Sequence, residues 1–272
     1  EGLKDTGARS LNLARGCQNK CNYCSFRVGP ASLGKDDMII YSDIVSQMTE
    51  ELALLASKGK TPGLVVLNTG TDCFAGGVEI QDLAFDAISL LLSRNIPIHI
   101  LTKGRIADRT LRLLESGAAL VKLTYSLASC EPDYYRQFEP EALDYEERLA
   151  EIERIRGAGL SIDARIEPLI PVVTDSRAQL DILVRALRSA GLTRFQTAYL
   201  RMNQDIMERL RKTVDPLTVG VLEGGYLDRD YPERSVIPPL PPGDTRRKVY
   251  RYLWDRAKSL GMKMTISTCS NP

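Results

Sequence analysis

The sequence contains no long hydrophobic run, no excess of charge of one sign and only one histidine. It has no run of about 18 apolar residues, the length that a membrane-spanning helix needs, and no signal-peptide pattern opens it. The 36 Lys and Arg residues nearly balance the 35 Asp and Glu residues, so the chain lacks a general positive field to hold duplex DNA. Its hydrophobic fraction of 43% excludes disorder. These features predict a folded, cytoplasmic protein without a membrane partner.

Apolar runs typical of strands alternate with helical patterns along most of the chain. Six βα units fit between residues 9 and 211, and repeated βα units predict a parallel sheet. A closed eight-fold barrel usually needs about 250 residues, so we expect an α/β fold with an open, partial (βα)6 TIM-type barrel over residues 1–211. The expected strands are Arg9–Ala14, Leu64–Asn68, Pro97–Leu101, Leu120–Ser126, Ser161–Ile166, Arg194–Leu200 and Met262–Thr268.

Residues 212–272 break this alternation. Prolines are frequent over residues 212–242, where we expect an irregular segment. A helix near residues 244–260 and a final short strand follow. We expect this C-terminal extension to pack on the barrel.

Three of the six cysteines, Cys17, Cys21 and Cys24, lie within eight residues in the spacing Cys-x3-Cys-x2-Cys. Three thiolates are one too few for a closed tetrahedral zinc site, and they leave one iron of a [4Fe–4S] cube without a protein ligand. The loop follows the first expected strand, so it lies at the edge of the sheet where α/β barrels carry out their chemistry. A structural zinc site with a distant fourth ligand is the alternative, for which His99, inside an expected strand, is a poor candidate.

This motif, with an aromatic residue before the third cysteine, resembles the radical S-adenosylmethionine (SAM) superfamily. The resemblance implies that the cluster binds SAM at its open iron and cleaves it reductively, and that the resulting 5′-deoxyadenosyl radical abstracts hydrogen from a substrate. It implies an external reductant such as flavodoxin or ferredoxin, and a lyase or transferase reaction. Further segments are similar to the spore photoproduct lyase-like (DNA repair photolyase-like) branch: Thr71-Asp72, Leu101–Lys103, Tyr125–Leu127, Phe138–Pro140, Glu147–Leu149, Arg165–Pro171 and Leu200–Met202.

The resemblance implies SAM-binding roles for polar residues at the strand ends. Thr71 and Asp72 would hold the methionine end of SAM, Lys103 its carboxylate, Ser126 a ribose hydroxyl, and Arg165 the carboxylate or the ribose. Each residue type has a structural alternative. Lys103 suits a solvated loop, Arg165 an ion pair with a nearby acid, and Asp72 the cap of a turn.

Two aromatic residues, Tyr23 and Phe26, flank the cluster loop and suit packing against adenine, although core packing is the alternative. Two positions depart from the branch. Thr69 stands where the lesion-repairing lyases carry a hydrogen-donating cysteine, and Ser25 stands in place of a tyrosine. Cys73, four residues after Thr69, is therefore the expected catalytic hydrogen donor.

The three scattered cysteines follow expected strands and define a second hypothesis. Cys73, Cys130 and Cys269 would form an auxiliary [4Fe–4S] cluster if they converge, but scattered cysteines do not report their distances. The substrate is open between a small molecule, a peptide and a nucleoside. Nucleic-acid lesion repair and iron–sulfur electron transfer without SAM chemistry are the alternative functions.

Overall fold

The computed structural model describes residues 8–28, 32–33, 37–226 and 240–267. In this part of the chain the main sheet has seven strands in the order β1-β4-β5-β6-β7-β8-β9, and every neighbouring pair is parallel. The strands are β1 (Ala8–Leu11), β4 (Leu64–Leu67), β5 (Ile98–Thr102), β6 (Val121–Ser126), β7 (Ser161–Leu169), β8 (Arg194–Tyr199) and β9 (Lys263–Ile266). The predicted α/β fold with an open, partial barrel is confirmed, because sequential strands are neighbours and the sheet does not close.

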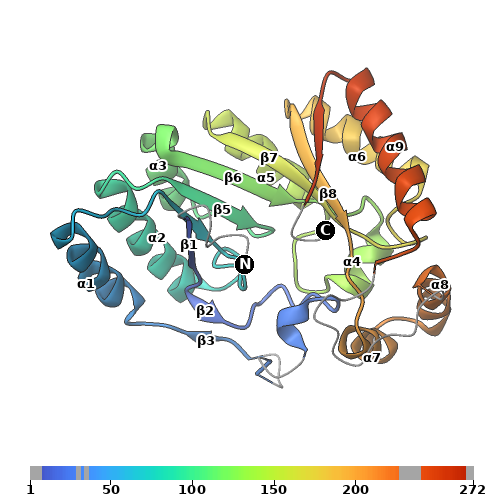
Figure 1. Ribbon diagram of the computed structural model, residues 1–272, viewed down its shortest axis with the longest axis horizontal. Coiled ribbons are helices and arrows are strands. Elements are labelled where there is room, and N and C mark those ends of the chain that lie inside the picture. The colour runs from blue at the N-terminus through green and yellow to red at the C-terminus, as the bar shows by residue number, and fades with distance from the viewer. Residues whose placement is uncertain (1–7, 29–31, 34–36, 227–239, 268–272) are drawn as a thin grey trace.

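Helices connect successive strands and cover the outer face of the sheet. They are α1 (Ile44–Ser57), α2 (Val78–Ser93), α3 (Asp108–Ser116), α4 (Pro132–Phe138), α5 (Tyr145–Gly157), α6 (Arg177–Ser189), α7 (Gln204–Thr213), α8 (Pro216–Tyr226) and α9 (Gly243–Ser259). Figure 1 shows α1 and α2 outside one end of the sheet and α6 and α9 outside the other. None of the helices among the described residues is long and apolar enough to cross a membrane.

The hydrophobic core lies between the sheet and the outer helices, and α6 shows how the sequence dictates this packing. Its residues Leu180, Leu183, Val184 and Leu187 recur at one-face helical spacing and are fully buried. Parallel strands are covered in the same way, so β5 buries Ile98 and Ile100. The polar ends of the strands are left at one edge of the sheet.

Two expectations need correction. The first expected strand, Arg9–Ala14, is interrupted: β1 ends at Leu11, and the short strand β2 (Ala14–Arg15) pairs with β3 (Ile39–Ile40) instead. The segment expected to be irregular begins with helix, because α7 runs past residue 211 and α8 begins at Pro216. Proline at the first position of a helix is favourable, since its fixed φ suits the helix and its missing N–H has no intrahelical partner there.

The C-terminal helix and strand extend the barrel. Strand β9 pairs with β8, and α9 packs on α6 and β9. The rest of the expected irregular segment, residues 227–239, lies outside the described residues.

Candidate cofactor site

A cavity of about 460 Å³ opens where the strands end. This volume lies within the usual range of roughly 300–1,000 Å³ for small-molecule sites. Its walls come from the loop after β1 and from the ends of β4, β5, β6, β7 and β8. The predicted residues among its lining are Cys17, Cys21, Tyr23, Cys24, Phe26, Thr71, Asp72, Lys103, Ser126 and Arg165.

The loop that carries the three cysteines is fixed at both ends. Gly16 adopts a φ of +87°, and a Cβ there would lie 2.3 Å from the carbonyl oxygen of Asp37, so only glycine fits. The carbonyl oxygen of Gly16 accepts a hydrogen bond from Thr71 Oγ1 (2.6 Å). Further along, Asn22 donates from its backbone N–H to Phe138 (2.8 Å) and from its amide to Gln137 (2.7 Å), which docks the loop onto the end of α4.

The three thiols of this loop share one wall of the cavity. Burial raises the pKa of Cys17 to about 12, and the Asp72 carboxylate adds to that rise. Burial also raises the pKa of Cys21 to about 11, although the Lys103 ammonium opposes it. Because both thiols are protonated at neutral pH without a metal, metal binding here would release protons.

The donor set fits an iron–sulfur cube better than a zinc ion. In the described part of the chain, no three His, Cys, Asp or Glu side chains converge on a point that one metal ion could occupy. A zinc site requires such convergence, with Zn–S distances of about 2.3 Å, whereas a cube binds each thiolate at a different iron. His99 offers no help to zinc, since it lies on β5 and hydrogen-bonds to Thr124 (2.8 Å).

Asp72 is buried, and its carboxylate is surrounded by protein donors. Oδ2 accepts from the Lys103 backbone N–H (2.7 Å) and from the Asn19 amide (3.2 Å), while Oδ1 accepts from Thr102 Oγ1 (2.8 Å) and the Phe74 N–H (3.1 Å). Burial nevertheless raises its pKa above the ordinary value. The carboxylate thus ties the ends of β4 and β5 to the cysteine loop, which matches the turn-capping alternative, while direct contact with SAM stays a prediction.

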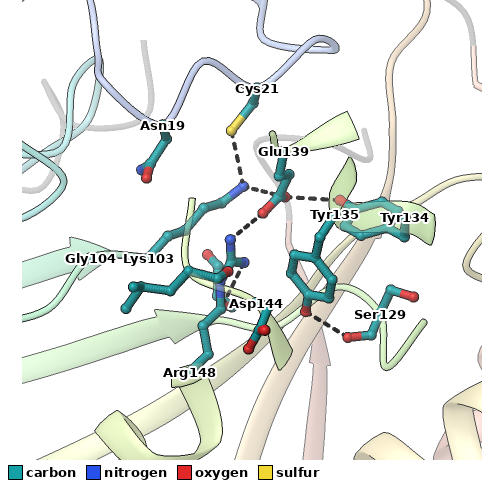
Figure 2. Close-up of polar contacts among 12 residues, drawn as sticks. Asn19, Cys21, Lys103, Gly104, Ser129, Tyr134, Tyr135, Glu139, Asp144 and Arg148 are labelled. Atoms are coloured by element: carbon teal, nitrogen blue, oxygen red, sulfur yellow. Dashed lines mark hydrogen bonds and ion pairs between the residues drawn. The ribbon is translucent and has the colours of Figure 1, made fainter. Parts of the chain in front are cut away.

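Lys103 belongs to a buried polar network rather than to a solvated loop (Figure 2). Its ammonium donates to Glu139 Oε1 (2.6 Å), to the Tyr23 hydroxyl, and to Cys21 Sγ (3.6 Å). Glu139 also accepts from Tyr134 (2.8 Å), from Tyr23 and from the fully buried Arg148.

The charge state of this network is set by its two cations. Burial alone would raise the pKa of Glu139, but Arg148 and Lys103 hold it well below its ordinary value. The carboxylate is therefore ionised and compensated from both sides.

Arg165 and Glu167 form an ion pair on the cavity wall, with Arg165 Nε donating to Glu167 Oε2 (2.5 Å). The structural alternative for Arg165 is thus realised, but the pair faces the cavity. Glu167 Oε1 is buried and has no hydrogen-bond partner in the part of the chain that the structure describes. A buried acceptor without a partner is costly in a protein interior, so this oxygen is suited to a ligand hydroxyl or amine.

The two predicted aromatic residues occupy different settings. Tyr23 is buried with its hydroxyl in the Glu139 network. Phe26 is 54% exposed and lies over Gly70, where an added Cβ would come within 3.2 Å of its ring. Only Phe26 therefore offers an open ring face at the cavity.

The structure does not bring Cys73 into the cavity. Its side chain is fully buried in the main hydrophobic core and is absent from the cavity lining. The expected hydrogen donor is thus misplaced, because Cys73 faces the core while the adjacent Asp72 faces the site. Thr69 does line the cavity, and its hydroxyl hydrogen-bonds to Ser10 Oγ (2.5 Å) and Asn12 Nδ2 (2.9 Å).

The auxiliary-cluster hypothesis gains no support from the described residues. Neither Cys73 nor Cys130 lines the cavity, and the polar neighbour of Cys130 is Glu131 (4.0 Å). Cys269 lies outside the described residues.

Sequence reasoning assigned no role to Glu139, Arg148 or Glu167. They stand in the segments Phe138–Pro140, Glu147–Leu149 and Arg165–Pro171, which carry part of the family resemblance. That resemblance was the available signal. No periodicity predicts that a loop acid at position 139 meets Arg148 on α5 and Lys103 after β5.

Comparison with known proteins places this geometry in context. A family model described as the radical SAM superfamily matches residues 11–179. Uncharacterized proteins of Mycobacterium tuberculosis and Mycobacterium bovis are each 30% identical over 193 residues, covering 68% of this chain and 56% of theirs. The chain thus spans little more than half the length of these relatives.

Solved structures share the fold at low sequence identity. A mutant of spore photoproduct lyase with bound AdoMet and dinucleoside spore photoproduct superposes with a TM-score of 0.70 at 17% identity, covering 94% of this chain and 75% of that chain. Streptococcus suis SuiB bound to S-adenosylmethionine gives a TM-score of 0.58 at 12% identity, covering 96% of this chain and 49% of that chain. These likenesses show the fold.

Proposed function

The chain belongs to the radical SAM superfamily, and on that premise we propose that it cleaves SAM reductively at a [4Fe–4S] cluster held by Cys17, Cys21 and Cys24. The observation that carries the proposal is the placement of the three thiols on one wall of the cavity at the strand ends. When bound, the reduced cluster and SAM supply a 5′-deoxyadenosyl radical that abstracts hydrogen from the substrate. The protein's own residues bind, orient and shield these groups.

The cavity walls offer distinct groups to the parts of SAM. Glu167 Oε1, the buried acceptor without a protein partner, suits a ribose hydroxyl, and Ser126 lies on the same wall. The exposed ring of Phe26 suits adenine. Thr71 and Asp72 act behind the cysteine loop, through Gly16 and Asn19, and so position the methionine end.

The hydrogen-atom chemistry differs from our expectation for Cys73. Among the described residues, the three cluster cysteines are the only thiols that line the cavity. We therefore propose a reaction, of lyase or transferase type, without a thiol donor at Cys73. Lesion repair of the kind suggested by the spore photoproduct lyase structures is not favoured, since Thr69 occupies the position of the expected donor.

Anaerobic reconstitution tests the proposal. We expect a brown protein with about four iron atoms per chain, as one [4Fe–4S] cluster requires, which forms 5′-deoxyadenosine from SAM when a reductant such as reduced flavodoxin is supplied. Cys21→Ser should lose iron and product. Cys130→Ser, a matched control outside the cavity, should keep both.

Three results would each contradict a part of the proposal. About one zinc ion per chain would exclude the cluster. An intact cluster without SAM cleavage would favour the electron-carrier alternative. A content of about eight iron atoms would restore the auxiliary cluster.

A further inference from the structure

The Lys103 ammonium already uses all of its hydrogen-bonding capacity within the protein. An ammonium has three N–H donors, and Lys103 Nζ has three acceptors: Glu139 Oε1 (2.6 Å), the Tyr23 hydroxyl and Cys21 Sγ (3.6 Å). Only 16% of its side chain is exposed. A SAM carboxylate could bind this ammonium only by displacing one of these partners.

Glu139 fixes the position of that ammonium. Its carboxylate is completely buried, and Oε1 accepts from Lys103, Tyr23 and Tyr134 while Oε2 accepts from Arg148. Arg148 is itself completely buried and donates to the carbonyl oxygens of Leu143 (2.7 Å) and Ser126 (3.3 Å). Figure 2 shows this chain of contacts leading from α5 through Glu139 to the ammonium and on to the cysteine sulfur.

A second cation on the cavity wall has donors to spare. Arg165 lines the cavity, and its guanidinium carries five N–H donors. Within the described part of the chain, its hydrogen bonding is confined to Nε and Glu167. Its terminal nitrogens can therefore meet a carboxylate bidentately without breaking a protein contact.

We propose that Lys103 serves the Cys21 sulfur of the cluster rather than the SAM carboxylate, that Glu139 is the positioning residue that holds it there, and that Arg165 binds the carboxylate. The inference rests on the proposed function. Hydrogen bonds to ligand sulfurs and nearby charge tune the potential of an iron–sulfur centre. A cation beside Cys21 stabilises the added electron, so Lys103 should raise the midpoint potential of the cluster.

Two measurements on reconstituted protein separate the roles of the two cations. The first is the midpoint potential without SAM, followed by electron paramagnetic resonance in a redox titration. The second is the Kd of SAM for the oxidised protein. Lys103→Met should move the potential to a more negative value and leave the Kd unchanged. Arg165→Met should leave the potential unchanged and weaken SAM binding by about tenfold or more, the loss expected for a charge-assisted hydrogen bond.

A control and a second substitution guard against trivial causes. Lys20→Met removes a cation from the same loop whose ammonium faces Glu141 (3.9 Å), and it should shift the potential less than Lys103→Met. An equal shift would mean a general charge effect and would overturn the assignment to Cys21. Should Lys103→Met fail to assemble a cluster, Lys103→Gln removes the same charge with a polar side chain and carries the same expectations.

The positioning role of Glu139 is tested by the sign of a shift. Losing a negative charge near the cluster would by itself raise the potential. Glu139→Gln should instead lower it, because Lys103 loses its anchor and leaves Cys21. A rise would refute the positioning role.

The outcomes also separate this inference from the proposed function. Weaker SAM binding in Lys103→Met with an unchanged potential would overturn the inference alone. Wild-type protein that shows no reducible [4Fe–4S] signal would overturn the proposed function.

Discussion

The buried Arg148–Glu139 pair gives a direct test of how this site is stabilised. Arg148→Met removes the guanidinium that bonds Glu139 and two backbone carbonyls, all without exposed surface on the Arg148 side chain. Breaking a buried ion pair by removing one partner typically costs about 3–5 kcal/mol. Because Lys103 continues to compensate Glu139, we expect the lower end, about 3 kcal/mol.

Equilibrium urea unfolding of the cluster-free, reduced protein measures this loss. For a chain of this length each kcal/mol corresponds to roughly 2 °C in Tm, so calorimetry should show a fall of about 6 °C. Arg136→Met is the matched control, since its pair with Asp133 on α4 is about three-quarters exposed on both sides. Exposed pairs contribute roughly 0–1 kcal/mol.

The double variant Arg148→Met, Glu139→Gln extends the test. Removing both charges should recover part of the stability lost in Arg148→Met, because no uncompensated carboxylate remains. The reasoning is refuted if Arg148→Met loses no more stability than Arg136→Met, or if the double variant is less stable than the two single changes predict together.

Three further predictions concern other parts of the molecule. Burial and the nearby Lys122 lower the pKa of His99 to about 4; the unfolded chain, with an ordinary pKa of about 6.5, then binds more protons, so the unfolding free energy should fall by at most about 3 kcal/mol as pH drops from about 6.5 to 4, and His99→Gln should flatten this pH dependence in urea titrations. Gly104→Ala would place Cβ 2.3 Å from the Phe74 backbone and should lower Tm or prevent folding, whereas Gly157→Ala, with nothing within 4 Å, should raise stability by about 0.5–1 kcal/mol; equal effects would contradict the packing argument. Asp72→Asn places an amide donor against donors and should cost about 1–3 kcal/mol of unfolding free energy and reduce iron uptake, and an unchanged denaturation midpoint would count against its role as a hub.

The structural role of Asp72 also changes how the strand-end residues are understood. Thr71 and Asp72 contact the cysteine loop and Lys103 contacts a cysteine sulfur, while Arg165 and Glu167 face the open cavity. The strand ends thus divide between groups that hold the cluster loop and groups that remain available to a ligand.

The alternation of apolar strands and one-faced helices was readable in the sequence, because burial of a parallel sheet and of a helix stripe imposes local periodicities. The cysteine spacing was readable for a similar reason, since three ligands on one short loop keep their proximity in any fold. Single positions in turns were not readable. Asp72 and Cys73 are neighbours, yet one faces the site and the other the core, because the direction of a turn side chain depends on backbone angles that no periodicity dictates. The Glu139 network joins α5, the loop after α4, the end of β5 and the cysteine loop, and only the packing of the barrel brings these distant segments together.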